Sequence, residues 1–76
     1  MDITKALKMA MIERNMKQVD VANRIFTSEN SKNTFNNLLR RNDYKLNDII
    51  KIAGVLDYDV KLQFVDRNTG KKIEVE

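Results

Sequence analysis

The chain has 76 residues, enough for one small hydrophobic core and therefore one domain. It contains no cysteine and no histidine, which excludes disulfides, Cys/His zinc sites, and serine or cysteine nucleophiles activated by histidine. No apolar run approaches the roughly 18 residues that a membrane span needs, and the N-terminus lacks the apolar region of a signal peptide. We therefore expect a single cytoplasmic domain, residues 1–76, that uses no metal or cofactor and does not contact a membrane.

Charge is distributed unevenly along the chain. Residues 1–45 contain nine basic and five acidic side chains, whereas residues 46–76 contain five and six. A basic half favours a polyanionic partner such as nucleic acid, but a well-solvated surface explains the same numbers. Charge alone leaves both interpretations open.

Hydrophobic spacing predicts two helices in the first third of the chain. The first has an apolar stripe at helical spacing, formed by Ile3, Ala6, Leu7, Ala10 and Met11. We expect Asp2 to cap the start of this helix, and Asn15, which tolerates a left-handed backbone, to end it. A second helix is expected over residues 17–25, with three side chains facing inward: Val21, Ala22 and Ile25.

Two further helices are expected after residues 26–31, a polar segment rich in turn-forming and capping residues. The third helix is predicted over residues 32–41, and its inward side chains are Phe35, Leu38 and Leu39. The fourth is predicted over residues 46–56, with an apolar stripe at helical spacing formed by Leu46, Ile49, Ile50, Ala53 and Leu56.

The hydrophobic pattern changes from helical spacing to simple alternation after residue 59. Two alternating runs flank a polar stretch that ends in Gly70; their apolar members are Val60, Leu62, Phe64, Ile73 and Val75. This arrangement predicts a β-hairpin with a bulged turn. The expected fold is therefore mainly α, with a four-helix core over residues 1–59 and a C-terminal β-hairpin over residues 60–76.

No group of residues in the sequence favours catalysis. Gly54 and Gly70 fall in a predicted helix and a predicted turn, so they form no phosphate-binding loop. Asp57 and Asp59 lie at a helix-to-strand corner, where turn formation explains them better than general acid–base chemistry. We expect that the protein is not an enzyme.

Residues 17–45 carry the pattern of a helix-turn-helix. The small residue Ala22 follows Gln18 by four positions, and after a turn Phe35 and Leu38 stand one helical turn apart. A small residue lets two helices cross closely, and the second helix then presents a polar face to solvent or to a DNA major groove.

That polar face is rich in asparagine, which is a poor helix former because its side chain competes with the backbone for hydrogen bonds. An Asn amide matches the N6 and N7 groups of adenine, and Arg or Lys matches guanine or phosphate. A solvated helix face with capping residues explains the same composition. The polar residues concerned are Asn30, Lys32, Asn33, Asn36, Asn37, Arg40, Arg41 and Asn42.

Residues 6–60 resemble the lambda-repressor-like, or XRE-type, helix-turn-helix regulators of bacteria and phages. Three segments in the same order and spacing carry the resemblance: Met16–Ile25, Ser31–Leu38 and Leu46–Asp57. The chain departs from the family at Lys17, where a Ser or Thr cap is usual, and at Phe26, where glycine is usual. Its turn over residues 26–31 is also longer than the family's. A hairpin also replaces the family's fifth helix, as in small Cro-like proteins that dimerise through β structure.

The resemblance implies a division of roles on DNA. Base contacts are expected from the third helix, at Lys32, Asn33 and Asn37. Contacts with the DNA backbone are expected from the start of the second helix, the third helix and the loop after it: Gln18, Asn36, Arg40, Arg41, Asn42 and Lys45. Phosphate contacts fix the orientation of such a domain, and base contacts read the sequence.

The function implied is that of a sequence-specific regulator of transcription, a repressor that occupies an operator in double-stranded DNA. The alternative is a protein-binding helix-turn-helix module, such as an antitoxin or a phage-encoded inhibitor. DNA binding requires the three base-contacting residues to be exposed together, whereas a protein-binding module would more readily expose an apolar patch beside them. Single-stranded RNA is disfavoured because stacking aromatics are nearly missing, and we expect Tyr44 and Tyr58 to pack.

The hairpin is expected to make a homodimer, because an isolated two-stranded hairpin is marginal in water. Joining strand edges or packing faces across a two-fold axis would bury Leu62, Phe64, Ile73 and Val75. The same axis would place two third helices roughly 34 Å apart, one turn of DNA, and so favour a palindromic operator. The alternative is a monomer in which Leu62 and Phe64 pack on Ile49 and Ile52.

Overall fold

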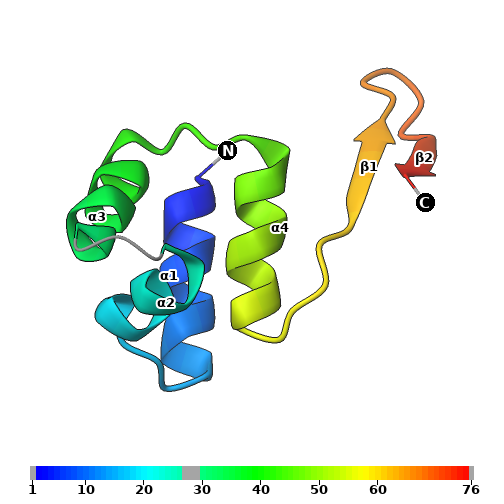
Figure 1. Ribbon diagram of the computed structural model, residues 1–76. Helices are drawn as coiled ribbons and strands as arrows, with labels where there is room; N and C mark the ends of the chain where they lie inside the picture. Colours follow the sequence, from blue (N-terminus) through cyan, green and yellow to red (C-terminus); the bar gives the residue numbers. More distant parts are fainter. Residues whose placement is uncertain (1, 27–29, 76) are drawn as a thin grey trace.

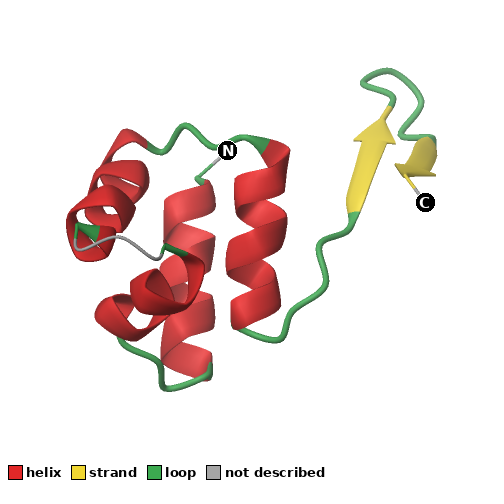
Figure 2. Cartoon of the chain, in the orientation of Figure 1, coloured by secondary structure: helices red, strands yellow, loops and turns green. Residues whose placement is uncertain are grey.

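Four helices precede a two-stranded antiparallel hairpin in the residues that the computed structural model describes, 2–26 and 30–75 (Figures 1 and 2). The elements are α1 (Ile3–Glu13), α2 (Gln18–Ile25), α3 (Ser31–Arg41), α4 (Leu46–Val55), β1 (Leu62–Val65) and β2 (Lys72–Val75). The mainly α class with a C-terminal hairpin is the predicted one. The helices α2, α3 and α4 each begin and end within one residue of their predicted bounds.

The helices enclose a single hydrophobic core. Its most deeply buried large side chains come from α2, α3 and the C-terminal half of α4: Val21, Phe35, Ile52 and Leu56. Leu7 and Met11 of α1 pack against the same cluster. Burial of an apolar side chain of this size contributes on the order of 1.5–3 kcal/mol. Ala22 is fully buried as predicted, and α2 packs directly against α3.

The helix ends follow the capping chemistry of the sequence. The Asp2 side chain accepts a hydrogen bond from the Lys5 amide at 2.9 Å, which confirms it as the cap of α1. Asn15 and Asp57 adopt left-handed backbones, with φ of 55° and 62°. After each of them an amide returns to a carbonyl five residues back, from Met16 to Met11 and from Tyr58 to Ala53. Both helices therefore end in a Schellman motif without glycine.

Arg14 joins the end of α1 to the end of α4, a role that spacing did not predict. Its Nε donates to the Leu56 carbonyl at 2.9 Å and its Nη2 donates to the Asp57 carbonyl at 3.2 Å. The guanidinium carbon also lies 4.1 Å from the centre of the Tyr58 ring. A cation at the C-terminal end of a helix is favourable there. This contact fixes the point at which the chain leaves the helices.

The apolar stripes of α1 and α4 are not buried along their whole length. Ala6 is exposed, and Leu46 and Ile50 are each 49% exposed. Ile52, which the predicted stripe omits, is 1% exposed. The true inward face of α4 is rotated toward Ile52 and Ala53, so Ile50 lies outside it. Ala6 and Leu46 keep their helical spacing but line an open groove between α1 and α4.

The hairpin stands away from the helices (Figure 1). Its strands pair in continuous one-to-one register, from Leu62 opposite Val75 to Val65 opposite Lys72. The predicted bulge lies at the turn, where the Asp66 carbonyl accepts from the Gly70 amide and the Asp66 amide donates to the Lys71 carbonyl, so that two residues oppose one. Every residue of both strands is exposed. The monomer in which Leu62 and Phe64 both pack on the helices is therefore not the observed arrangement.

The turn of the hairpin is organised by Asp66. Its carboxylate accepts hydrogen bonds from the amides of Asn68 and Thr69, at 2.8 and 3.3 Å. These bonds, that from Asn68 first, lower the pKa of Asp66 below its ordinary value of 3.8. The Asp66 amide donates to the Lys71 carbonyl, and Gly70 supplies the left-handed residue with φ of 75°. The predicted glycine position in the turn is confirmed.

Candidate nucleic-acid interface

The outer face of α3 is polar along its described length. Its apolar side chains, Phe35, Leu38 and Leu39, are buried, and no large apolar side chain of this helix is exposed among those that the structure describes. Its exposed side chains are Lys32, Asn33, Thr34, Asn36, Asn37, Arg40 and Arg41. The helix contains basic residues and no acidic one. This face has hydrogen-bonding groups and positive charge and nothing that needs to be buried.

The three predicted base-contacting residues are exposed together on this face. Lys32 and Asn33 lie in the first turn of α3, and Asn37 lies one turn further along. The preceding loop includes residues 27–29, which lie outside the described part of the chain. The predicted turn over 26–31 can therefore be followed only at its ends.

Phe26 explains how the chain leaves α2 without the glycine that the resemblance led us to expect. Its backbone is extended, with φ of −109° and ψ of 132°, a conformation open to any residue. Its ring lies 6.5 Å from that of Phe35, tilted by 48°. The side chain thus packs on α3, so the departure at this position has a structural use.

A shallow depression of about 270 Å³ brings three of the predicted backbone-contacting residues together. It is lined by Gln18 at the start of α2, by Asn36, Leu39 and Arg40 of α3, and by Lys8 of α1. Lys8 was not predicted. The signal that could have found it is its place off the apolar stripe of α1, although sequence alone does not show that α1 passes beside α3.

The start of α2 adds a second feature to this depression. Lys17 makes no side-chain hydrogen bond to cap the helix, and the first amides that bond back to Lys17 are those of Asp20 and Val21. An N-terminus without a side-chain cap presents amide groups and the positive end of the helix dipole, which suits a phosphate. The replacement of the usual Ser or Thr by Lys17 also adds a positive charge here.

Asn37 and Arg40 form a pair on the surface of α3. Arg40 Nη2 donates to Asn37 Oδ1 at 2.6 Å. A bidentate contact with adenine needs both the oxygen and the nitrogen of the amide. Asn37 therefore either reads a base together with Arg40 or must first release it. A second depression, of about 320 Å³, is lined by Thr34, Asn37, Arg40 and Arg41, so these side chains form one continuous patch.

Asn42 has a structural task within the fold. It ends α3 with a left-handed backbone, φ 51°, and its Oδ1 accepts the Thr4 amide of α1 at 3.0 Å. The Thr4 hydroxyl lies 2.6 Å from both the Leu39 carbonyl and the Tyr44 hydroxyl. A hydroxyl has one proton, so Thr4 donates to Leu39 and accepts from Tyr44. This use explains Asn42 without DNA, and its side-chain oxygen is already engaged.

Lys45 and Arg41 flank this junction and are exposed. Lys45 precedes α4, where its backbone amide donates to the Asp48 carboxylate at 3.3 Å. Tyr44 and Tyr58 are both half-buried against the core, as predicted. No group of three carboxylate, histidine or cysteine side chains suited to a metal occurs among the described residues.

Comparison of the chain with protein-family models, with curated proteins and with solved structures gave no match. Within the described residues, no helix combines the length and apolar character needed to cross a bilayer. The geometry of α3 and its neighbours is therefore the ground on which a function is proposed.

Proposed function

We propose that this protein is a sequence-specific regulator that binds double-stranded DNA through α3 and occupies a palindromic operator as a homodimer. In this role α2 and α3 are the helix-turn-helix, and α3 enters the major groove. The proposal is that of a cytoplasmic repressor of the lambda-repressor-like kind, which the sequence resembles. The observation that carries it is the exposed face of α3, which is wholly polar over its described side chains and has no acidic residue.

The neighbourhood of α3 supplies suitable phosphate contacts. Lys8, Gln18 and Arg40 line one depression beside the uncapped start of α2, so a DNA strand passing there would meet positive charge and free amides. Arg41 ends α3, and Lys45 lies in the loop that follows it. Backbone contacts from these residues would fix the orientation of α3 on a duplex.

The alternative, a protein-binding module, would more readily expose an apolar patch beside Lys32, Asn33 and Asn37, and the described part of α3 exposes none. Large exposed apolar side chains do occur at the hairpin and on α4. A protein partner is therefore better placed there than on α3, and its presence is compatible with DNA binding.

The direct test is selection from a random duplex library with the full chain, followed by fluorescence anisotropy of the selected site at several salt concentrations. We expect an enriched palindrome and an affinity that falls with salt. Each neutralised phosphate contributes a log–log slope of about −0.9, so a dimer with a few charged contacts per chain should give a slope of several units. No enrichment, together with a slope near zero, would exclude this function.

A further inference from the structure

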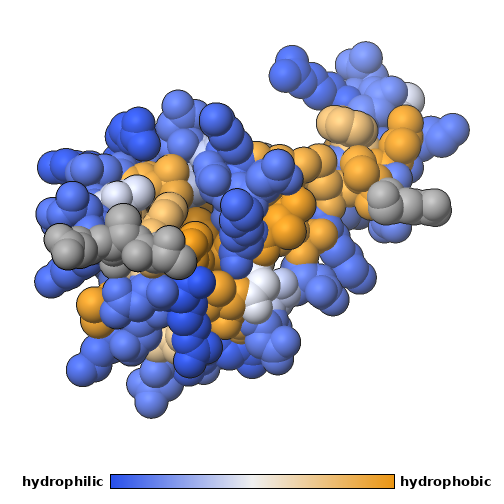
Figure 3. All heavy atoms as spheres, viewed as in Figure 1, coloured by the Kyte–Doolittle hydropathy of each residue, from blue (hydrophilic) through white to orange (hydrophobic). Residues whose placement is uncertain are grey.

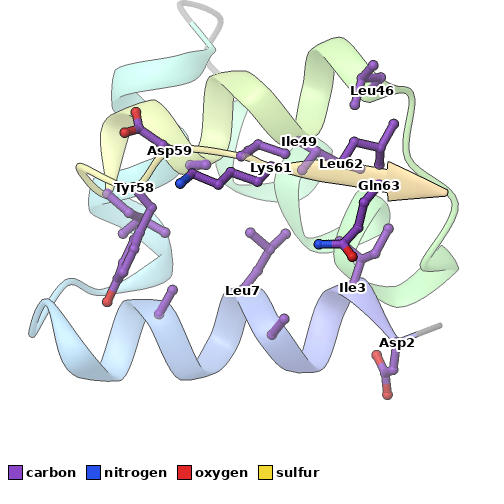
Figure 4. Close-up of a pocket in the computed structure, with 15 residues that line it drawn as sticks. Asp2, Ile3, Leu7, Leu46, Ile49, Tyr58, Asp59, Lys61, Leu62 and Gln63 are labelled. Carbon is purple, nitrogen blue, oxygen red and sulfur yellow. The ribbon is translucent and has the colours of Figure 1, made fainter. Parts of the chain in front are cut away.

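An open apolar groove runs between α1 and α4 (Figure 4). Its volume is about 510 Å³, and its walls come from Ile3 and Ala6 of α1 and from Leu46 and Ile49 of α4. Leu7 lies in its floor, and the segment that leads into β1 runs lengthwise between the two helices. Ala6 and Leu46 belong to the apolar stripes of their helices, yet here they are exposed. The single chain therefore covers this groove only in part.

The hairpin has an uncovered apolar face of its own. Directly opposed residues of an antiparallel pair lie on the same face, so the register places four apolar side chains together: Leu62, Val75, Phe64 and Ile73. These side chains are between 39% and 64% exposed. The other face carries Gln63, Glu74, Val65 and Lys72, which are mostly polar. A two-stranded hairpin needs packing on such an apolar face to be stable.

The two uncovered surfaces are continuous in one chain but do not cover each other. Figure 3 shows apolar atoms extending from the helices to the hairpin. Of the strand residues, the groove is lined by Leu62 and Gln63, while Phe64 and Ile73 lie beyond it and are more than 60% exposed. Arg14 holds the exit of the chain from α4, and the hairpin that follows stands away from the helices.

The length of the molecule favours one way of covering both surfaces. The chain extends 48 Å along its longest axis, with α3 toward one end and the hairpin at the other (Figure 1). Two chains joined end to end by their hairpins would hold their α3 helices more than one DNA turn, roughly 34 Å, apart. Chains that overlap along this axis bring the two α3 helices closer. This argument from the length of the chain rests on the proposed DNA binding. The observation of two uncovered apolar surfaces does not.

We propose that the chain forms an arm-exchanged homodimer, in which the apolar face of each hairpin packs into the α1–α4 groove of the second copy. Phe64 and Ile73 are the side chains that enter the groove, and they cover Ala6 and Leu46 of the other chain. The exchange covers both surfaces with a second copy of the same chain. A two-fold axis repeats the contact, so that each chain provides one hairpin and one groove.

Cysteine crosslinking tests this arrangement directly, because the chain has no cysteine of its own. One chain carries Ala6→Cys at the groove and an affinity tag, and a second, untagged chain carries Ile73→Cys on the apolar face of the hairpin. The two are mixed, allowed to exchange and treated with a short thiol crosslinker. We expect a mixed covalent dimer as the main product. The matched control replaces Ile73→Cys by Lys72→Cys, on the polar face of the hairpin, and should lower the mixed product at least several-fold.

The other outcomes each overturn the proposal. Products formed only between two Ile73→Cys chains would show hairpins packed face to face. An internally closed monomer of the Ala6→Cys, Ile73→Cys double variant, with no mixed dimer, would show an arm that folds back on its own chain. Sedimentation equilibrium of the unmodified chain as a monomer at micromolar concentration would exclude any dimer, and circular dichroism checks that each variant keeps its helices. None of these readouts uses DNA, so a failure here is distinct from a failure of DNA binding.

Discussion

The helical body and the hairpin arm differ in where their stability comes from. In the body, residues from α2, α3 and α4 bury their largest apolar side chains almost completely within one chain. In the arm, the strands bury none of theirs, although four apolar residues share one face of the hairpin, as they would in a packed sheet. An apolar strand face in the sequence therefore indicates that another element covers that face. It does not indicate which chain provides that element.

The body should be the region most sensitive to truncation of a side chain. Phe35→Ala removes a fully buried ring and should lower the free energy of unfolding by about 3–5 kcal/mol, which is most of what so small a domain has. Urea denaturation followed by circular dichroism measures this loss. The matched change Phe64→Ala removes an exposed ring from the arm, and at sub-micromolar concentration it should leave the helical transition in place. Equal losses for the two variants would mean that the arm packs on its own helices.

A charge on the apolar face of the arm should separate the chains without unfolding them. Phe64→Asp should convert the dimer to a monomer in sedimentation equilibrium. It should also weaken binding to a palindromic duplex on the order of a hundredfold, because the second half-site contact is no longer intramolecular. Val65→Asp places the same charge on the opposite face and should leave both properties close to the parent. If Val65→Asp dissociated the dimer and Phe64→Asp did not, the dimer contact would lie on the face of the hairpin that carries Val65.

Substitutions on α3 and in the loop after it should distinguish residues that recognise the base sequence from residues that only add affinity for DNA. Asn33→Ala should relax the preference at one base pair in each half-site, at a cost on the order of 1–3 kcal/mol. Lys45→Ala should instead weaken all duplexes about equally. Competition binding with single-base variants of the selected site measures both. Unchanged specificity in a folded Asn33→Ala protein would show that the base contacts lie elsewhere on α3.

The smallest expected effect lies in the turn of the arm. Because the pKa of Asp66 is lowered in the folded turn, the ionised carboxylate stabilises the turn above its ordinary pKa of 3.8. This stabilisation is lost as the pH falls through the lowered pKa. The amide resonances of Asn68 and Thr69 should shift over that acidic range in NMR spectra, while those of the core do not. Asp66→Asn keeps an acceptor oxygen and should remove the pH dependence.

The sequence predicted the parts of the fold that depend on neighbours along the chain. Helical spacing located all four helices, Asp2 and Asn15 marked the ends of α1, and alternation located the hairpin. The exposure of Ala6, Leu46 and Ile50 was not predicted, because it depends on how distant elements meet.

The candidate site shows the same limit. The exposure of Lys32, Asn33 and Asn37 could be predicted from the apolar positions of α3. The place of Lys8 beside Gln18, the clamp made by Arg14 and the hydrogen bonds of Asn42 to Thr4 join residues far apart in the chain. One sequence carries no signal for such contacts, because each of these side chains is common on solvated helices.

The exposed arm has a consequence for how operator occupancy would depend on the concentration of this protein. On the proposed dimer, an operator is filled by two chains, so at low concentration its occupancy rises with the square of the concentration and not in proportion to it. By linkage, DNA that favours the paired form tightens the pairing by the same factor by which pairing tightens DNA binding. A small apolar face on two short strands thus sets the threshold at which a gene would change from active to silent.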